Sequence, residues 1–243
     1  TGVEDGGHSW LVGCYDSHAN ENMGNSSARN IGVDSTATLI VMMGDSIIDG
    51  RDTLNIDDYL ATIHPNAVVV NEGWGGEKVQ TAVSSVDRMN YFTLYDADYY
   101  IMHWWTNDIS QGRTIQQITD DMETMYDFLK TDDNEVVLTA GMYADHSDYG
   151  GYPNSSINPT SSNATTQSLM NLANEKDAIF VRWDLAMYKN RTLYNQTDTL
   201  GYSDGVHPGS VGNERIARVT YLRLFNYSDF NDVNSTAIYN YTK

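Results

Sequence analysis

The sequence predicts an α/β fold, a doubly wound sheet of five parallel strands that alternate with helices. Two observations lead to this class. Short runs of apolar and β-branched residues recur five times between residues 38 and 183, separated by segments with helical spacing. Polar residues suited to catalysis follow the first three runs, at the sheet edge where ligands bind in such folds. With 243 residues, the chain can bury the core that one such domain needs.

The five predicted strands are short and mostly apolar. They cover 38–43, 67–71, 99–104, 135–142 and 178–183. The first is a continuous apolar and β-branched run, and the second is almost pure valine, as expected for strands buried on both faces of a parallel sheet. The first run stops at a Gly-Asp-Ser sequence, and the second leads into a glycine-rich turn.

Helices are predicted between these strands and after the last one. They cover 52–63, 78–89, 115–129, 165–175 and 210–225. The third is the clearest, because its apolar residues recur every three or four positions and acidic residues lie opposite. Two long connections, 143–162 and 185–203, interrupt the alternation, and long loops of this kind often carry function.

The chain is expected to comprise three parts. Residues 1–36 form an irregular arm, rich in Gly, Asn and Ser, that we expect to pack on the edge of the sheet. Residues 37–225 form the α/β domain, and residues 226–243 form a glycosylatable tail. Cys14 is the only cysteine, so it is either a buried free thiol or a partner for another chain.

Ser46 is the candidate nucleophile. Gly44 permits a sharp turn after the first strand, which leaves Ser46 at the carboxyl end of that strand. The serine could instead cap the helix that follows. A serine hydroxyl is a weak nucleophile alone, and it needs a base, a group that orients the base and an oxyanion site.

The candidate base is His207. Asp204 precedes it by three residues and could hold the imidazole in one tautomer from within the same loop. The segment 5–8 repeats the Asp-x-x-His pattern. That second copy lies before the nucleophile and outside the strand and helix alternation, so we favour the pair near the carboxyl terminus.

Two further residues could stabilise an oxyanion. Gly76, in the turn after the second strand, offers a backbone N–H, and Asn107, after the third strand, offers a side-chain amide. The neighbouring Asp108 is interpreted as a turn residue, since acyl transfer needs no second carboxylate there.

These residues occur in the order of a known family. The chain from about residue 38 to 225 resembles the SGNH or GDSL hydrolases through Gly44-Asp45-Ser46, Asn71-x-x-x-x-Gly76, Asn107-Asp108 and Asp204-x-x-His207. The resemblance implies a flavodoxin-like α/β/α sandwich and ester hydrolysis through an acyl-enzyme. Ser46 would be the nucleophile, His207 the general base and Asp204 its partner. The N–H groups of Ser46 and Gly76, with Asn107, would form the oxyanion hole.

One position departs from the family pattern. The third motif usually reads Gly-x-Asn-Asp, and here Trp105 occupies the glycine position. Trp105 could narrow the acyl pocket, and together with Trp74 it could form a surface for stacking on sugar rings. Tryptophan at the end of a strand is equally typical of core packing.

Charge limits the possible partners. There are 14 Lys and Arg against 33 Asp and Glu, which gives a net charge of −19 and an isoelectric point near 4.3. Nucleic acid and anionic membranes are therefore disfavoured, whereas a neutral glycan or a small ester is not repelled. The six histidines occur singly, without the spacing of metal ligands, and no apolar run has membrane length. We expect no cofactor and no metal.

Glycosylation signals point outside the cell. Asn-x-Ser/Thr sequons begin at Asn25, Asn154, Asn163, Asn190, Asn195, Asn226, Asn234 and Asn240. Composition alone predicts about three or four. We therefore expect a secreted or surface-displayed protein, although a surface rich in Ser, Thr and Asn would give some sequons without modification. The sequence begins at Thr1 and looks already processed.

Three hypotheses for the function follow. The first is a secreted serine esterase that removes short acyl groups, most plausibly acetyl, from carbohydrate. The second is a lipolytic esterase or lysophospholipase with the same catalytic residues. The third is a glycosylated subunit of a surface layer or filament, a homo-oligomer that retains the hydrolase fold.

Overall fold

The computed structural model describes residues 6–10, 29–33, 37–50, 54–140, 159–187 and 207–226. Two compact units make up the chain, Thr1–Ala37 and Thr38–Lys243. The first contains an antiparallel pair, β1 (Gly6–Trp10) and β2 (Arg29–Val33), whereas the sequence predicted an irregular arm. Pairing between distant segments is not visible in composition, which explains the difference. The packing of the arm on the sheet stays a prediction, and Cys14 lies outside the described residues.

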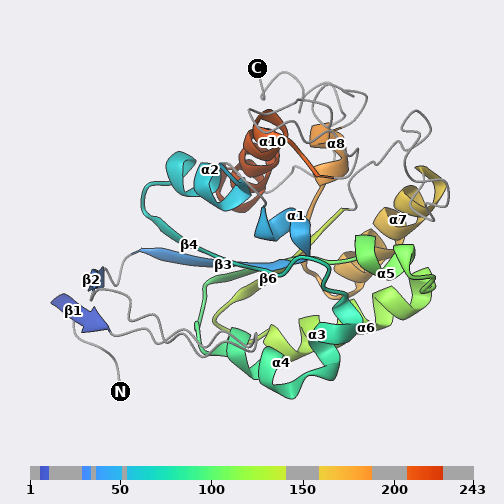
Figure 1. Cartoon of the computed structure of the whole chain (residues 1–243), viewed down its shortest axis with the longest axis horizontal. Helices are drawn as coiled ribbons and strands as arrows, with labels where there is room; N and C mark the ends of the chain where they lie inside the picture. The colour runs from blue at the N-terminus through green and yellow to red at the C-terminus, as the bar shows by residue number, and fades with distance from the viewer. Residues whose placement is uncertain are drawn as a thin grey trace, which may run out of the picture. The chain divides into compact units, whose positions relative to one another are not determined.

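The second unit is built on one parallel sheet of five strands (Figure 1). The strands are β3 (Thr38–Gly44), β4 (Ala67–Gly73), β5 (Tyr99–His103), β6 (Glu135–Thr139) and β7 (Ile179–Val181). Their spatial order is β4-β3-β5-β6-β7, so the chain enters the sheet beside one edge and then winds to both sides. This order confirms the predicted flavodoxin-like sheet of five strands.

Helices cover both faces of the sheet (Figure 1). One face carries α1 (Ser46–Asp49), α2 (Ile56–Ile63), α8 (Trp183–Met187) and α10 (Ser210–Tyr221), which continues as a π-helical turn, η2 (Leu222–Asn226). The other face carries α3 (Val79–Ser84), α4 (Val86–Thr93), α5 (Thr106–Ser110), α6 (Ile115–Leu129) and α7 (Pro159–Glu175). The second unit is therefore an α/β/α sandwich, as predicted.

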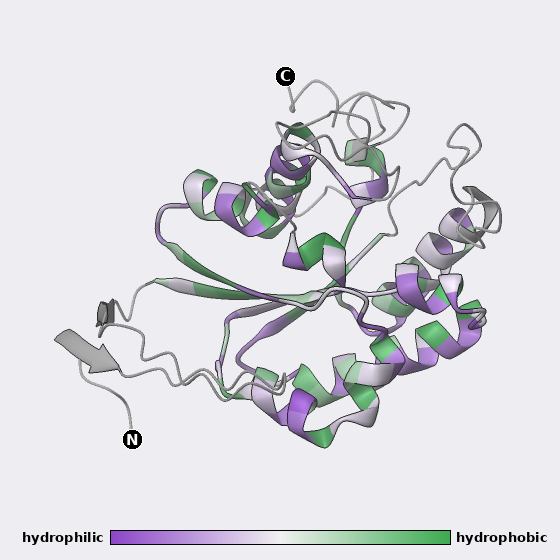
Figure 2. Ribbon diagram, in the orientation of Figure 1, coloured by the Kyte–Doolittle hydropathy of each residue, from purple (hydrophilic) through white to green (hydrophobic). Residues whose placement is uncertain are grey.

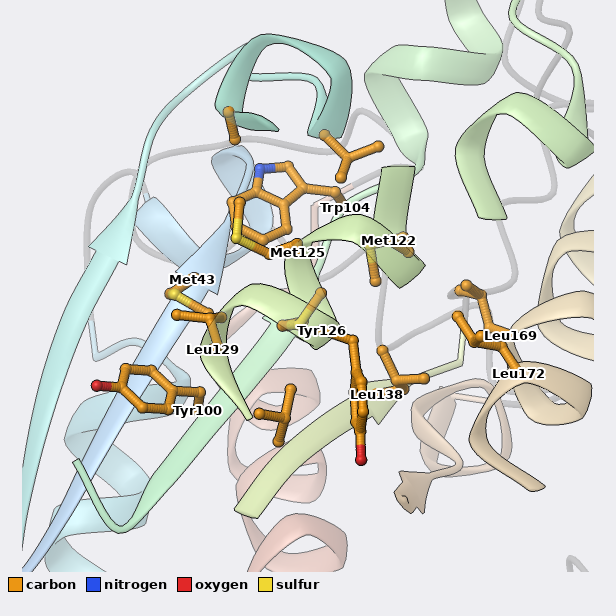
Figure 3. Packing of buried hydrophobic residues seen from close by; sticks show 14 of the residues in the cluster. Met43, Tyr100, Trp104, Met122, Met125, Tyr126, Leu129, Leu138, Leu169 and Leu172 are labelled. Carbon is orange, nitrogen blue, oxygen red and sulfur yellow. The ribbon is translucent and has the colours of Figure 1, made fainter. Parts of the chain in front are cut away.

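Each layer boundary has its own core. Successive side chains of β3 point to opposite faces of the sheet. Met43 therefore lies in the cluster under α3, α4, α6 and α7, and Met42 lies in the cluster under α2, α8 and α10. Figure 2 shows apolar residues along the strands and on the inner sides of the helices. In Figure 3, Met122 and Met125 of α6 lie near Trp104 within the cluster of buried residues. The methionines of this helix are core residues, as their spacing indicated.

Some predicted boundaries were wrong. The helix predicted over 78–89 is two helices, because Ser85 ends α3 and its Oγ accepts the Arg88 N–H at 3.2 Å to begin α4. Helix α7 begins at Pro159 instead of residue 165, inside the predicted loop, since a proline fits the first turn of a helix. Strand β6 ends at Thr139, and α8 occupies the start of the predicted connection 185–203.

The packing of α2 on α10 gives a test of the fold. Leu60 of α2 is fully buried in the cluster with Ile216, whereas Leu54, just before the helix, is 56% exposed. Replacing Leu60 with Ala should lower the free energy of unfolding by about 3 kcal/mol, because it leaves a cavity. The matched change Leu54→Ala should cost about 0.5 kcal/mol or less. Denaturant titration of both variants measures the difference, and equal losses would contradict the described packing.

Candidate active site

A tight turn places Ser46 at the carboxyl end of β3. A side chain at Gly44 would put its Cβ 2.3 Å from the His103 carbonyl oxygen and 2.7 Å from Ile48 Cγ1, so only glycine fits. The Asp45 N–H then donates to the same carbonyl of His103 at 3.3 Å. Ser46 follows as the first residue of α1 and keeps 9% of its surface exposed.

The structure brings Ser46 and His207 together. Ser46 Oγ lies 2.7 Å from His207 Nε2, although the two residues are 161 positions apart in the sequence. The histidine comes just before α10, whose helix packs on the same face of the sheet as α1. A hydroxyl and an imidazole at this distance can exchange a proton, as general base catalysis requires. Asp204, the predicted partner of His207, lies outside the described residues, and its role stays a prediction.

Asp45 lies beneath this pair and is completely buried. Its Oδ1 accepts the Ile47 N–H at 3.0 Å, so Asp45 and not Ser46 caps α1. Burial raises the pKa of Asp45 to about 7, although the Ile47 N–H and the nearby charge of His207 favour the ionised form. Because the Asp45 side chain caps α1, the alternative interpretation of Ser46 as the helix cap is wrong.

The glycine-rich turn after β4 lies against the serine. Trp74 N–H donates to the Gly44 carbonyl at 2.9 Å, and a Cβ built on Gly75 would lie 4.0 Å from Ser46 Cβ. A Cβ on Gly73 would meet the backbone nitrogen of Asp49 at 2.1 Å, so this position also requires glycine. Gly76 has a φ of +82°, in the left-handed region that glycine adopts without strain.

Asn107 joins the same turn from α5. Its Nδ2 donates to the backbone carbonyl of Glu77, the residue after Gly76, at 3.1 Å. A side-chain amide has two N–H groups, and among the described residues this bond accounts for one of them. The structure thus places both predicted oxyanion donors, Gly76 and Asn107, at the turn that contacts Ser46. Their catalytic role stays a prediction.

Asp108 ties α5 to the start of α3. It is fully buried, accepts the Val79 N–H at 3.1 Å and pairs with Arg113 at 2.7 Å. Burial raises the pKa of Asp108, and the bonds from Arg113 and Val79 oppose that rise. These contacts fit the structural role that the sequence indicated for this residue.

The two tryptophans proposed for substrate binding differ in exposure. The Trp74 ring is 61% exposed, whereas Trp105 is 1% exposed and belongs to the core cluster beside Trp104. A ring in that position can limit a pocket from within but cannot offer a face to a sugar. The prediction of a stacking surface is therefore wrong for Trp105, because its side chain enters the core where α5 begins, and it stays a prediction for Trp74.

His103 is a buried residue of the site region that the sequence analysis did not identify. Thr139 Oγ1 donates to the Met102 carbonyl at 2.9 Å, so in the 2.7 Å contact between His103 Nδ1 and that hydroxyl the imidazole is the donor. The ring stacks on Trp183 with centroids 4.6 Å apart. Burial lowers the pKa of His103 to about 3, so the ring is neutral. The position of His103 directly after an apolar run could have indicated from the sequence that this histidine is buried.

Among the residues that the structure describes, no three His, Cys, Asp or Glu side chains gather in a way that could hold a metal ion. None of the helices in this part of the chain has the length and apolar composition to cross a membrane.

Comparison with protein families gives a match over most of the chain. The model of the GDSL-like lipase/acylhydrolase family matches residues 42–215, which include Ser46, Gly76, Asn107 and His207. The chain belongs to this family. The resemblance seen in the sequence is thereby confirmed, and the protein is a serine ester hydrolase of the GDSL type. No curated protein sequence matches the chain.

Solved structures share the fold of this GDSL hydrolase at low identity. A member of the lipolytic G-D-S-L family from Veillonella parvula is 18% identical, with a TM-score of 0.59 over 78% of this chain and 98% of that one. A catalytic mutant of Axe2, an acetylxylan esterase from Geobacillus stearothermophilus, is 16% identical, with a TM-score of 0.62 over 79% and 96% of the two chains. Both confirm the α/β/α arrangement.

The buried His103 should contribute a loss of stability in acid. The folded state holds the ring neutral down to about pH 3, whereas the unfolded chain binds a proton near pH 6.5, so the contribution of His103 to stability falls as the pH drops below 6.5, while the raised pKa of Asp45 acts in the opposite direction. The loss at pH 5 should be about 2 kcal/mol. His103→Asn stays neutral and can still donate to Thr139, so this part of the loss should disappear. Urea titrations at pH 7 and pH 5 measure it, and the same pH dependence in both proteins would refute the assignment.

Proposed function

We propose that the protein removes short acyl groups, acetyl in particular, from carbohydrate by way of an acyl-enzyme on Ser46. The observation that carries this proposal is the 2.7 Å contact between Ser46 Oγ and His207 Nε2, beside the turn that bears Gly76. This arrangement supports the proposal because it would bring the proposed nucleophile, base and oxyanion donors together in one place.

The proposed reaction has two halves. His207 Nε2 takes the proton of Ser46 as Oγ attacks the ester carbonyl, and the negative charge on the carbonyl oxygen is met by the N–H groups of Ser46 and Gly76 and by Asn107. The C–O bond to the sugar then breaks, and His207 returns its proton to the leaving hydroxyl. Water, activated by the same imidazole, releases the carboxylic acid and restores Ser46. Asp204 is proposed to orient His207 from the preceding loop.

Several properties support a carbohydrate ester as the substrate. The Trp74 ring is exposed on the turn that contacts Ser46, and an aromatic face of this kind stacks on sugar rings. The net charge of −19 does not repel a neutral glycan. The Geobacillus protein that shares the fold is an acetylxylan esterase, which makes acetylated xylan a suitable first substrate to assay.

We also propose that the protein works outside the cell. The eight sequons support this location, and Asn163, which lies on α7, has an exposed side chain. The side chains of the other seven lie outside the described residues.

The nucleophile gives the most direct test. Ser46→Ala should lower kcat/KM for p-nitrophenyl acetate at least about a thousandfold, because no other group can form the acyl-enzyme. The variant should also lose covalent labelling by a fluorophosphonate, a reagent that attacks activated serines. Ser84→Ala, at an exposed serine on α3, serves as the matched control and should leave both measurements unchanged. Undiminished turnover by the Ser46 variant would eliminate the proposed mechanism.

The carbohydrate assignment is tested at Trp74. Trp74→Ala should raise KM for acetylated xylo-oligosaccharides about fivefold to tenfold, since one stacking contact is lost, while p-nitrophenyl acetate hydrolysis should change little. Leu94→Ala, which changes a side chain 77% exposed, is the control. Equal effects on both substrates would argue against a sugar platform. A preference of the native protein for long acyl chains over acetate would support the lipolytic alternative instead.

A further inference from the structure

One guanidinium closes the turn that carries Gly76. The Nη2 atom of Arg88, on α4, donates to the Glu72 carbonyl at 2.8 Å, and its Nη1 pairs with Glu72 Oε2 at 3.3 Å. The Nε atom pairs with Glu77 Oε1 at 3.1 Å. Glu72 directly precedes Gly73, and Glu77 directly follows Gly76. Both ends of the segment 73–76 are therefore held by the same side chain.

The carboxylates of Glu72 and Glu77, which Arg88 joins, also have other hydrogen-bond partners. Glu77 Oε2 accepts the indole N–H of Trp104 at 3.1 Å, and its backbone carbonyl accepts the Asn107 amide at 3.1 Å. Glu72 Oε1 accepts the hydroxyl of Tyr95. The Arg88 side chain is 14% exposed, that of Glu72 15% and that of Glu77 4%. Charged groups buried to this extent hold their geometry far better than an ion pair on the surface.

Backbone bonds hold the first part of the turn, because Trp74 N–H donates to the Gly44 carbonyl and Glu77 N–H donates to the Trp74 carbonyl, each at 2.9 Å. Positions 73, 75 and 76 are glycine, the residue with the greatest backbone freedom. At Gly76 nothing lies within 4 Å of the place that a Cβ would occupy, so this residue has open space on that side. Its placement therefore depends on its chain neighbours, and Glu77, the next residue, is one of the two that Arg88 holds. The guanidinium carbon of Arg88 also lies 5.5 Å from the centre of the Trp74 ring and 4.5 Å from that of Phe92.

We propose that Arg88 is a positioning residue for the oxyanion site, an inference that rests on the proposed function. Its guanidinium binds Glu72 and Glu77 together, and in this way it keeps the Gly76 N–H directed at the space beside Ser46. Through the Glu77 carbonyl, it also fixes the amide of Asn107. Donors that are fixed in advance stabilise the transition state without reorganisation, and this contribution depends on their placement to within about 1 Å.

The test uses the substitution Arg88→Lys, which keeps the charge but cannot form the fork. With p-nitrophenyl acetate, kcat should fall by a factor on the order of ten to a hundred, while KM changes less than about twofold, because the loss affects the transition state alone. The matched control is Arg218→Lys, on α10, where the arginine pairs with Glu214 four residues earlier and is 45% exposed. This control should retain the native rate.

A double-mutant cycle separates positioning from a general effect on the structure. If Arg88 acts through the oxyanion donors, Arg88→Lys should cost much less in an Asn107→Ala background than in the native protein. Equal costs in the two backgrounds would overturn the proposal, as would a rise in KM with kcat unchanged. Should Arg88→Lys fail to fold, Glu72→Gln removes one ion pair and retains the backbone contact, and it must still lower kcat. The Ser46→Ala result is independent of these outcomes, so failure of this inference and failure of the proposed reaction are distinguishable.

Discussion

The close approach of three strand ends at Gly44 is the constraint on which the site depends. In the sheet, Gly44 lies opposite Gly73 of β4 and His103 of β5. The room for a side chain at Gly44 is filled by the His103 carbonyl, and the room at Gly73 is filled by the backbone of α1. The three connections that follow β3, β4 and β5 therefore begin next to one another at the same edge of the sheet. Ser46, the glycine turn and Asn107 lie together because their strands end together.

Burial beneath the serine removes charge from the site. His103 is held neutral, and burial raises the pKa of Asp45 to about 7, which favours the uncharged form of this carboxyl compared with an exposed one. The attraction between Asp45 and His207 is mutual. In the proposed reaction the imidazole of His207 accepts the serine proton, and its new positive charge would favour the ionised form of Asp45. The buried carboxyl can thus respond to the reaction without contacting the substrate, while Asp204 remains the proposed partner of the ring.

Periodicity and the parallel, doubly wound class of the sheet were visible in the sequence because they are local or follow from general rules, whereas the flavodoxin-like arrangement was implied by the family resemblance. The α6 helix was predicted to its exact bounds from apolar spacing alone, and the winding of the sheet follows from alternating strands and helices. The break between α3 and α4 was missed because it depends on one hydroxyl, that of Ser85, and no periodicity reports it. For Trp105 the sequence left core packing and sugar stacking as equal alternatives, and it did not reveal the stacking of His103 on Trp183, because both contacts depend on the spacing between layers.

No arginine was assigned a role from the sequence. In a chain with 33 acidic and 14 basic residues, no spacing pattern distinguishes a buried arginine from an exposed one. The structure shows two arginines at the loops that build the site, with side chains 13% and 14% exposed. Arg88 joins the two ends of the glycine turn, and Arg113 holds Asp108, which caps the helix after that turn. In both cases the guanidinium pairs with acidic residues on each side of it, Glu72 and Glu77 for the first and Asp108 and Asp121 for the second. An acidic chain that must fix flexible backbone near a nucleophile needs cations there, because buried carboxylates alone would repel one another and take up protons.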